Sequence, residues 1–170
     1  MDEQKVIILS DTHMPNKSKK LPGKLNFELE HADLIIHLGD WQTAELYYEL
    51  NRYAPVEGVA GNVDNDEIVR ILGFEKIISL NGINIGLTHG HLGKGRSTPI
   101  RALNTFKYQN VNIILFGHSH IPINETANGI TLFNPGSPTD KRRQSHFSYG
   151  ILNISHHNFS IHHRFFTSNE

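Results

Sequence analysis

The sequence has 170 residues, which suits a single domain spanning residues 1–170, and its 38% hydrophobic and 19% charged content is ordinary for a soluble globular protein. Sixteen lysines and arginines stand against seventeen acidic residues, and this near-neutral balance disfavours a protein that grips long nucleic acids. No cysteine is present, which excludes disulfides, thiolate metal sites and a cysteine nucleophile.

The start of the chain runs directly into an apolar strand predicted at residues 6–9. Four apolar residues are too few for the apolar region of a signal peptide. No apolar run in the sequence approaches the length of a transmembrane helix. We therefore expect a cytoplasmic protein with no membrane partner.

The first half of the chain alternates strands with helices. Short apolar runs rich in β-branched residues predict strands at residues 6–9, 34–38 and 56–60. Helices are predicted around Phe27, Leu29 and Ala32, at residues 44–50, and at residues 66–72 before Gly73. This order is typical of right-handed βαβ units with parallel strands.

The second half is predicted to be mainly antiparallel. Asn81 and Gly82 form a strong two-residue hairpin signal between strands at residues 76–80 and 83–88. A helix at residues 99–107 precedes a buried strand at residues 111–116. Further strands are predicted at residues 122–126, 130–133, 148–154 and 159–166. We expect an α/β fold in which two mixed sheets stack face to face, with helices on their outer sides.

Five polar clusters each follow an apolar run that is predicted as a strand. They are Asp11-Thr12-His13, Gly39-Asp40, Gly61-Asn62, His89-Gly90-His91 and Gly117-His118-Ser119-His120. Taken singly, most have an ordinary explanation, such as a solvated loop, a helix cap or a turn. Together they place an oxygen or imidazole ligand after nearly every buried strand, which suits Mn²⁺, Fe or Zn²⁺. The ordered set predicts a two-metal site and a hydrolase of phosphate esters.

The same motifs, in this order between Asp11 and His120, resemble those of the calcineurin-like metallophosphoesterases. The small size looks most like that family's short, single-domain prokaryotic phosphodiesterases, and residues 134–137 (Asn-Pro-Gly-Ser) are a further similarity. The resemblance implies a four-layer αββα sandwich, which agrees with the predicted order of elements.

The resemblance also implies two divalent metal ions, with Mn²⁺ expected first and Fe, Zn²⁺ or Ni²⁺ as alternatives. One ion would be held by Asp11, His13, Asp40 and His120. The second ion would share Asp40 and would be held by Asn62, His89 and His118. A hydroxide that bridges the two metals would attack a small phosphodiester, while the Asn62 amide binds substrate and stabilises charge on the phosphoryl oxygens.

One position departs from the family pattern. The histidine that usually follows Gly-Asn, and that is credited with protonating or stabilising the leaving group, is replaced by Val63. His91 is a candidate replacement. An equally favoured interpretation is that His91 only orients His89. Arg96 is the cation expected to contact the phosphate, whereas the basic runs at residues 17–20 and 141–143 are interpreted as solvated loops.

An alternative from another class is a non-catalytic protein-interaction scaffold, as in the metallophosphoesterase-like subunit of the retromer coat. Val63 favours that alternative, but a scaffold has no chemical need for seven intact ligands.

Two further expectations concern the C-terminal half. Phe165 and Phe166 are expected to be exposed and could mark a homo-oligomer interface, and His163 is expected on a solvated face.

Overall fold

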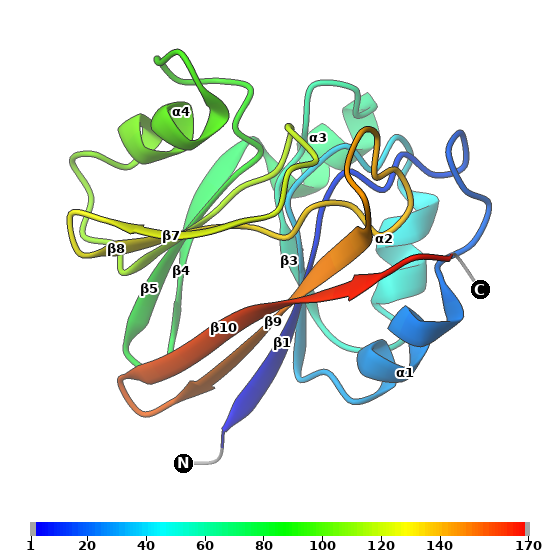
Figure 1. Cartoon of the computed structure of the whole chain (residues 1–170), viewed down its shortest axis with the longest axis horizontal. Helices are drawn as coiled ribbons and strands as arrows, with labels where there is room; N and C mark the ends of the chain where they lie inside the picture. Colours follow the sequence, from blue (N-terminus) through cyan, green and yellow to red (C-terminus); the bar gives the residue numbers. More distant parts are fainter. Residues whose placement is uncertain (1–2, 169–170) are drawn as a thin grey trace.

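The computed structural model describes residues 3–168 and shows two five-stranded sheets packed face to face (Figure 1). The first sheet has the order β10-β9-β1-β2-β3, and its strands are β1 (Gln4–Leu9), β2 (Leu34–His37), β3 (Val56–Gly58), β9 (Phe147–Ser155) and β10 (Asn158–Phe166). The second sheet has the order β4-β5-β6-β8-β7, and its strands are β4 (Glu75–Leu80), β5 (Ile83–Thr88), β6 (Ile113–Leu115), β7 (Ile123–Ala127) and β8 (Ile130–Asn134). Both sheets are mixed: β1 pairs in parallel with β2 and antiparallel with β9, and β5 pairs in parallel with β6 and antiparallel with β4.

Helices cover the outer faces of the two sheets. They are α1 (Gly23–Glu30), α2 (Glu45–Leu50), α3 (Asp66–Leu72) and α4 (Thr98–Thr105). The first three share one apolar cluster with the outer face of the first sheet, and α4 packs against the outer face of the second. The four-layer αββα sandwich predicted from the sequence is therefore confirmed.

The packing of strand β1 on both faces explains why its sequence is apolar at every position from residue 6 to residue 9. Val6 and Ile8 pack in the cluster between the two sheets, whereas Ile7 and Leu9 pack in the cluster under the helices. All four side chains are fully buried. Because successive side chains of a strand point to opposite faces, a strand covered on both sides needs a continuous apolar run.

Helix α1 buries Leu25 and Leu29 and leaves Phe27 64% exposed. Two side chains of β10 lie elsewhere than expected. Phe166 is buried because it packs in the apolar cluster under the helices, whereas Phe165 is exposed. His163 is partly buried rather than solvated: it stacks on Phe133, and its Nε2 lies 2.7 Å from the Asn134 carbonyl oxygen.

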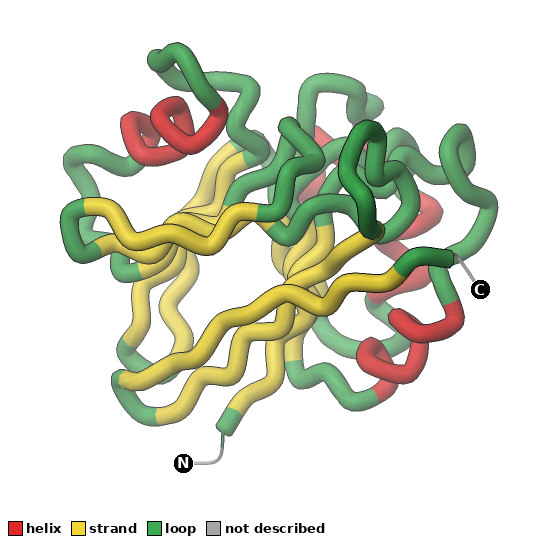
Figure 2. Tube along the Cα trace, viewed as in Figure 1, coloured by secondary structure: helices red, strands yellow, loops and turns green. Residues whose placement is uncertain are grey.

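The loops at the carboxyl ends of the parallel strands gather at one edge of the sandwich (Figure 2). Backbone hydrogen bonds tie these loops together, from Asp11 N–H to the Gly39 carbonyl (2.9 Å) and from Gly117 N–H to the His89 carbonyl (3.0 Å).

None of the helices in the described part of the chain has the length and apolarity needed to cross a membrane.

Candidate metal centre

The predicted ligands come from loops of both sheets. Asp11 and His13 follow β1, Asp40 follows β2, Asn62 lies beyond β3, His89 directly follows β5, and His118 and His120 follow β6. Parallel strands end at a common edge, so residues far apart in the sequence converge there.

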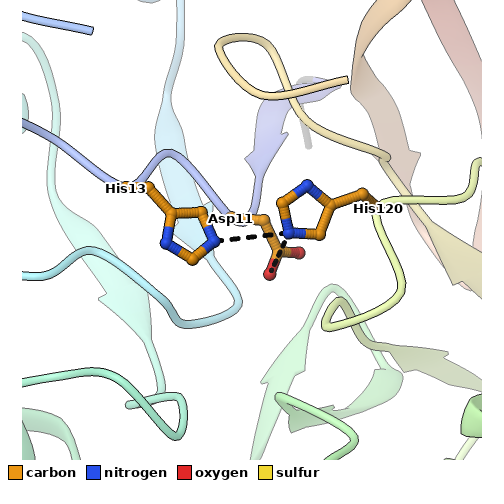
Figure 3. Close-up of side chains that lie close together, drawn as sticks. All are labelled: Asp11, His13 and His120. Atoms are coloured by element: carbon orange, nitrogen blue, oxygen red, sulfur yellow. Dashed lines mark hydrogen bonds and ion pairs between the residues drawn. The ribbon is translucent and has the colours of Figure 1, made fainter. Parts of the chain in front are cut away.

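Three of these side chains form a first ligand group, made of Asp11, His13 and His120 (Figure 3). The two imidazole rings point toward one another, with 3.3 Å between their Nε2 atoms. His120 Nε2 also lies 3.5 Å from Asp11 Oδ1. All three residues are buried, and one ligand atom from each lies within 4.8 Å of the others, so together they could hold a metal ion.

A second ligand group consists of Asp40, His89 and His118. His89 Nε2 lies 3.3 Å from Asp40 Oδ2, and the same oxygen lies 3.6 Å from His13 Nε2 of the first group. Asp40 therefore stands between the two groups. The side-chain oxygen of Asn62 lies 3.1 Å from His118 Nδ1, which brings the neutral amide to the outer side of the second group.

Among residues 3–168, two buried ligand atoms of this centre have no hydrogen-bond partner: Asp11 Oδ1 and His89 Nε2. The second polar atom of each side chain does form a hydrogen bond. Asp11 Oδ2 accepts from Ser10 Oγ at 2.7 Å, and His89 Nδ1–H donates to the Leu38 carbonyl at 2.7 Å. An unpartnered buried polar atom costs about 1–3 kcal/mol. Metal ions bound to these oxygen and nitrogen atoms would remove that cost, and the donor set therefore fits divalent cations.

The electrostatics of the centre also favour added positive charge. Burial raises the pKa of Asp11 to about 7, and the nearby Asp40 carboxylate adds to the rise. Burial alone would lower the pKa of His89, but Asp11 and Asp40 together raise it to about 9. Two carboxylates thus compete for one imidazolium, which is the situation that a bound cation relieves.

Five of the seven predicted ligands adopt a left-handed backbone conformation, which is uncommon for residues other than glycine. Their φ angles are 56° for Asp11, 47° for His13, 60° for Asp40, 70° for His118 and 60° for His120. Such conformations cost about 1–3 kcal/mol each and are concentrated at functional sites. The surrounding hydrogen bonds must therefore hold these backbones in place.

Residues 134–140 are one source of that support. Ser137 Oγ donates to the Asp11 carbonyl at 2.8 Å, and Thr139 Oγ1 donates to the Thr12 carbonyl at 2.7 Å. Asn134 Nδ2 donates to the Gly117 carbonyl at 3.0 Å, and His120 Nδ1–H donates to the Asp140 carbonyl at 2.5 Å. This single segment braces the loop after β1 and the loop after β6 against each other.

Asp64 supports the second group in a similar way. Its carboxylate accepts three backbone N–H groups, from Asp40 (2.9 Å), Gly61 (2.6 Å) and Gln42 (2.7 Å). The sequence analysis assigned no role to Asp64, Ser137 or Thr139. Asp64 is the acidic residue at the end of the Gly61-Asn62-Val63-Asp64 motif, and Ser137 ends the Asn-Pro-Gly-Ser similarity, so both motifs pointed toward this support.

Val63 takes part through its backbone. Its N–H donates to Asp40 Oδ1 at 3.2 Å, while its side chain is 44% exposed. The position therefore holds Asp40 whichever side chain it carries.

The structure separates the two other predicted contributors to catalysis and binding. The His91 ring centroid lies 5.3 Å from that of His89, and within residues 3–168 the buried His91 Nδ1 has no hydrogen-bond partner. Arg96 is exposed, and its contact with phosphate stays a prediction. The charges of Arg101 and Arg142 add to the effect of burial in lowering the pKa of His118.

Comparison with known proteins shows similarity to one family. The model of the calcineurin-like phosphoesterase superfamily domain matches residues 5–157. Probable metallophosphoesterase MJ0623 of Methanocaldococcus jannaschii is 34% identical over 135 residues, which cover 79% of this chain and 68% of that protein. Phosphodiesterase YfcE of Escherichia coli K12 is 34% identical over 115 residues, which cover 64% of this chain and 59% of that protein.

Among solved structures, Vacuolar Protein Sorting 29 from Cryptosporidium parvum matches with a TM-score of 0.79. The match covers 98% of this chain and 99% of that chain at 17% sequence identity. At that identity the likeness shows a shared fold and nothing about activity.

Proposed function

The chain belongs to the calcineurin-like phosphoesterase superfamily and is a phosphoric ester hydrolase, and we propose that its substrates are small phosphodiesters. One observation carries this proposal: two groups of ligand side chains lie next to one another, with Asp40 between them. The relative named a phosphodiesterase supports the choice of diesters over other phosphate esters.

We assign one divalent ion to Asp11, His13, Asp40 and His120, and a second to Asp40, Asn62, His89 and His118. The donors are oxygen and imidazole nitrogen without sulfur, which suits Mn²⁺, Fe or Zn²⁺, and Mn²⁺ remains the first expectation. When bound, such a pair of ions supplies an activated water as the hydroxide nucleophile near neutral pH and neutralises charge on the phosphoryl group.

The protein's own residues orient these parts. The Val63 N–H holds Asp40 Oδ1, which leaves Oδ2 directed toward His13 and His89. With its side-chain oxygen toward His118, Asn62 has its amide N–H groups free to donate to a phosphoryl oxygen. His91, beside His89, is the residue proposed either to assist the leaving group or to orient His89.

The border of the centre favours a diester over a monoester. Val63 next to the second group and Ile121 next to the first are 44% and 45% exposed. Apolar side chains on both borders can contact the two organic substituents of a diester. A monoester has only one such substituent and carries up to two negative charges at neutral pH.

The substrate is proposed to be a small molecule, and a cytoplasmic location stays a prediction. The alternative of a non-catalytic scaffold shares the fold and the exposed Val63. The two proposals differ in turnover, because a scaffold has no use for the ligand atoms that converge here.

The test is hydrolysis of bis(p-nitrophenyl) phosphate and p-nitrophenyl phosphate by metal-stripped protein, before and after addition of Mn²⁺. We expect no turnover without metal, and a higher kcat/KM for the diester once metal is restored. Preference for the monoester would contradict the choice of substrate. No turnover of either ester by protein that has bound Mn²⁺ would favour the scaffold.

A further inference from the structure

A pocket of about 350 Å³ lies directly beside the metal centre, and the proposed roles above leave it without a function. It is lined by Ser119, Ile121, Arg142, Arg143 and Gln144. Ser119 stands between His118 and His120, so the wall of the pocket and the ligands of both groups belong to one short loop. A substituent that extends from a phosphate bound at the centre can therefore enter this pocket.

The opposite wall is a tight turn at residues 141–144. The Gln144 N–H donates to the Lys141 carbonyl at 2.9 Å, and Lys141 Nζ donates back to the Gln144 carbonyl at 3.1 Å. Arg142, the second residue of the turn, has a φ of 48°, a conformation that turns usually give to Gly, Asn or Asp.

This turn is anchored to the metal centre. His120 Nδ1–H donates to the carbonyl of Asp140, the residue before the turn, at 2.5 Å. The Asp140 N–H donates to Ser137 Oγ at 2.8 Å, and Ser137 in turn holds the loop that carries Asp11. The two arginines are therefore presented from a fixed backbone, which lowers the entropic cost of binding an anion between them.

The pocket is cationic. Its lining contains two arginines and no carboxylate, and within residues 3–168 neither guanidinium is seen in a hydrogen bond or an ion pair. The nearest acidic group on the anchoring segment is Asp140, whose Oδ2 lies 3.9 Å from His120 Nδ1. Arg142 lines this pocket together with Ser119, the residue between the predicted ligands His118 and His120. The pocket therefore places a cation beside the loop that carries both ligands.

We propose that this pocket is a substrate subsite that selects phosphodiesters whose retained substituent carries an additional phosphate group, with Arg142 on the side of the reacting phosphate and Arg143 binding the added one. This inference rests on the proposed phosphodiesterase function. A guanidinium binds a phosphate through paired, charge-assisted hydrogen bonds, and Ile121 supplies an apolar wall for the linking group. The volume of this pocket is at the small end of the range for ligand sites, so the pocket suits a single substituent and not a polymer.

The test uses two substrates that share a leaving group: thymidine 5′-(p-nitrophenyl phosphate) and the same compound with a 3′-phosphate. For the Mn²⁺-loaded protein we expect kcat/KM to be about tenfold higher for the compound with the 3′-phosphate, the effect of one charge-assisted hydrogen bond. Arg143→Gln should abolish this preference, and Arg142→Gln should lower kcat/KM for both substrates. Arg70→Gln, an exposed arginine of α3 outside the pocket, should keep the tenfold ratio.

Equal kcat/KM values for the two substrates in the wild-type protein would overturn the subsite while leaving the phosphodiesterase intact. A second readout needs no turnover: calorimetric binding of thymidine 3′,5′-bisphosphate and thymidine 5′-monophosphate to the Mn²⁺-loaded protein. The bisphosphate should bind about tenfold more tightly to the wild type and no more tightly to Arg143→Gln. Equal binding by the wild type would also overturn the subsite, whereas tighter binding without turnover would contradict only the proposed function.

Discussion

The two ligand groups of the metal centre differ in how they are enclosed. Asp11, His13 and His120 are all buried, and residues 134–140 brace the loops that carry them. In the second group His118 is only partly buried, and Asn62 beside it is exposed. One side of the centre is therefore enclosed and held by hydrogen bonds, whereas the other is open to solvent and to substrate.

The largest effect is expected at Asp40, the residue between the two groups. Asp40→Asn removes the carboxylate charge that we assign to both ions, so kcat/KM for a diester should fall by a factor of at least about 10³, within the range expected of electrostatic stabilisation. Steady-state kinetics with saturating Mn²⁺ measures this. The exposed Asp66→Asn in α3 is the matched control and should keep wild-type turnover. Wild-type activity in Asp40→Asn would refute the shared role.

A paired comparison of His120→Gln with His118→Gln tests the difference in enclosure. Each variant loses one imidazole, but we expect excess Mn²⁺ to restore much of the activity of His118→Gln, because the second group is open to solvent. His120→Gln should not be rescued, because it also loses the hydrogen bond that ties His120 to Asp140. Titration of activity against Mn²⁺ concentration measures both, and equal rescue would remove the distinction between the groups.

The brace itself is tested by Ser137→Ala. Ser137 is buried, and the change leaves the Asp11 carbonyl and the Asp140 N–H without their partner. The free energy of unfolding should fall by about 1–3 kcal/mol, as denaturant titration of metal-free protein would show. The exposed Ser145→Ala should change it by less than about 0.5 kcal/mol. A similar loss in both variants would argue against a brace.

The smallest expected change is at the open border, where Val63 stands in place of the family's usual histidine. Val63→His should raise kcat for diesters with a poor, alkoxide leaving group by about tenfold or more, since a positioned proton donor helps such groups to depart. It should change little for p-nitrophenyl esters, whose leaving group needs no proton. Val63→Ala is the control and should not raise kcat for the diesters with a poor leaving group, because it adds no proton donor while the backbone N–H at this position still holds Asp40.

Much of this architecture could be predicted from the sequence because two simple patterns specify it. Residues 6–9 are apolar at every position, as a strand covered on both faces requires, and a ligand-bearing cluster follows that strand and four later ones. The contacts of the supporting residues could not be predicted in this way. Asp64 and Thr139 are polar residues in loops, where polar residues are common, and only the folded chain shows which backbone groups they bind.

The wrong expectations concern exposure. Phe165 and Phe166 are adjacent apolar residues of β10, and the sequence does not reveal that only Phe166 is covered by the helices. His163 was expected to be solvated, but its ring stacks on Phe133 of the other sheet. Local patterns predict elements well, but they do not fix how a loop or a helix face is turned relative to the rest of the molecule.

Anomalous diffraction from a crystal of Mn²⁺-loaded protein tests the two-metal centre most directly. We predict two manganese peaks per chain, one among Asp11, His13 and His120 and the other among Asp40, His89 and His118. Peaks elsewhere, or no more than one peak at saturating Mn²⁺, would contradict the two-metal centre.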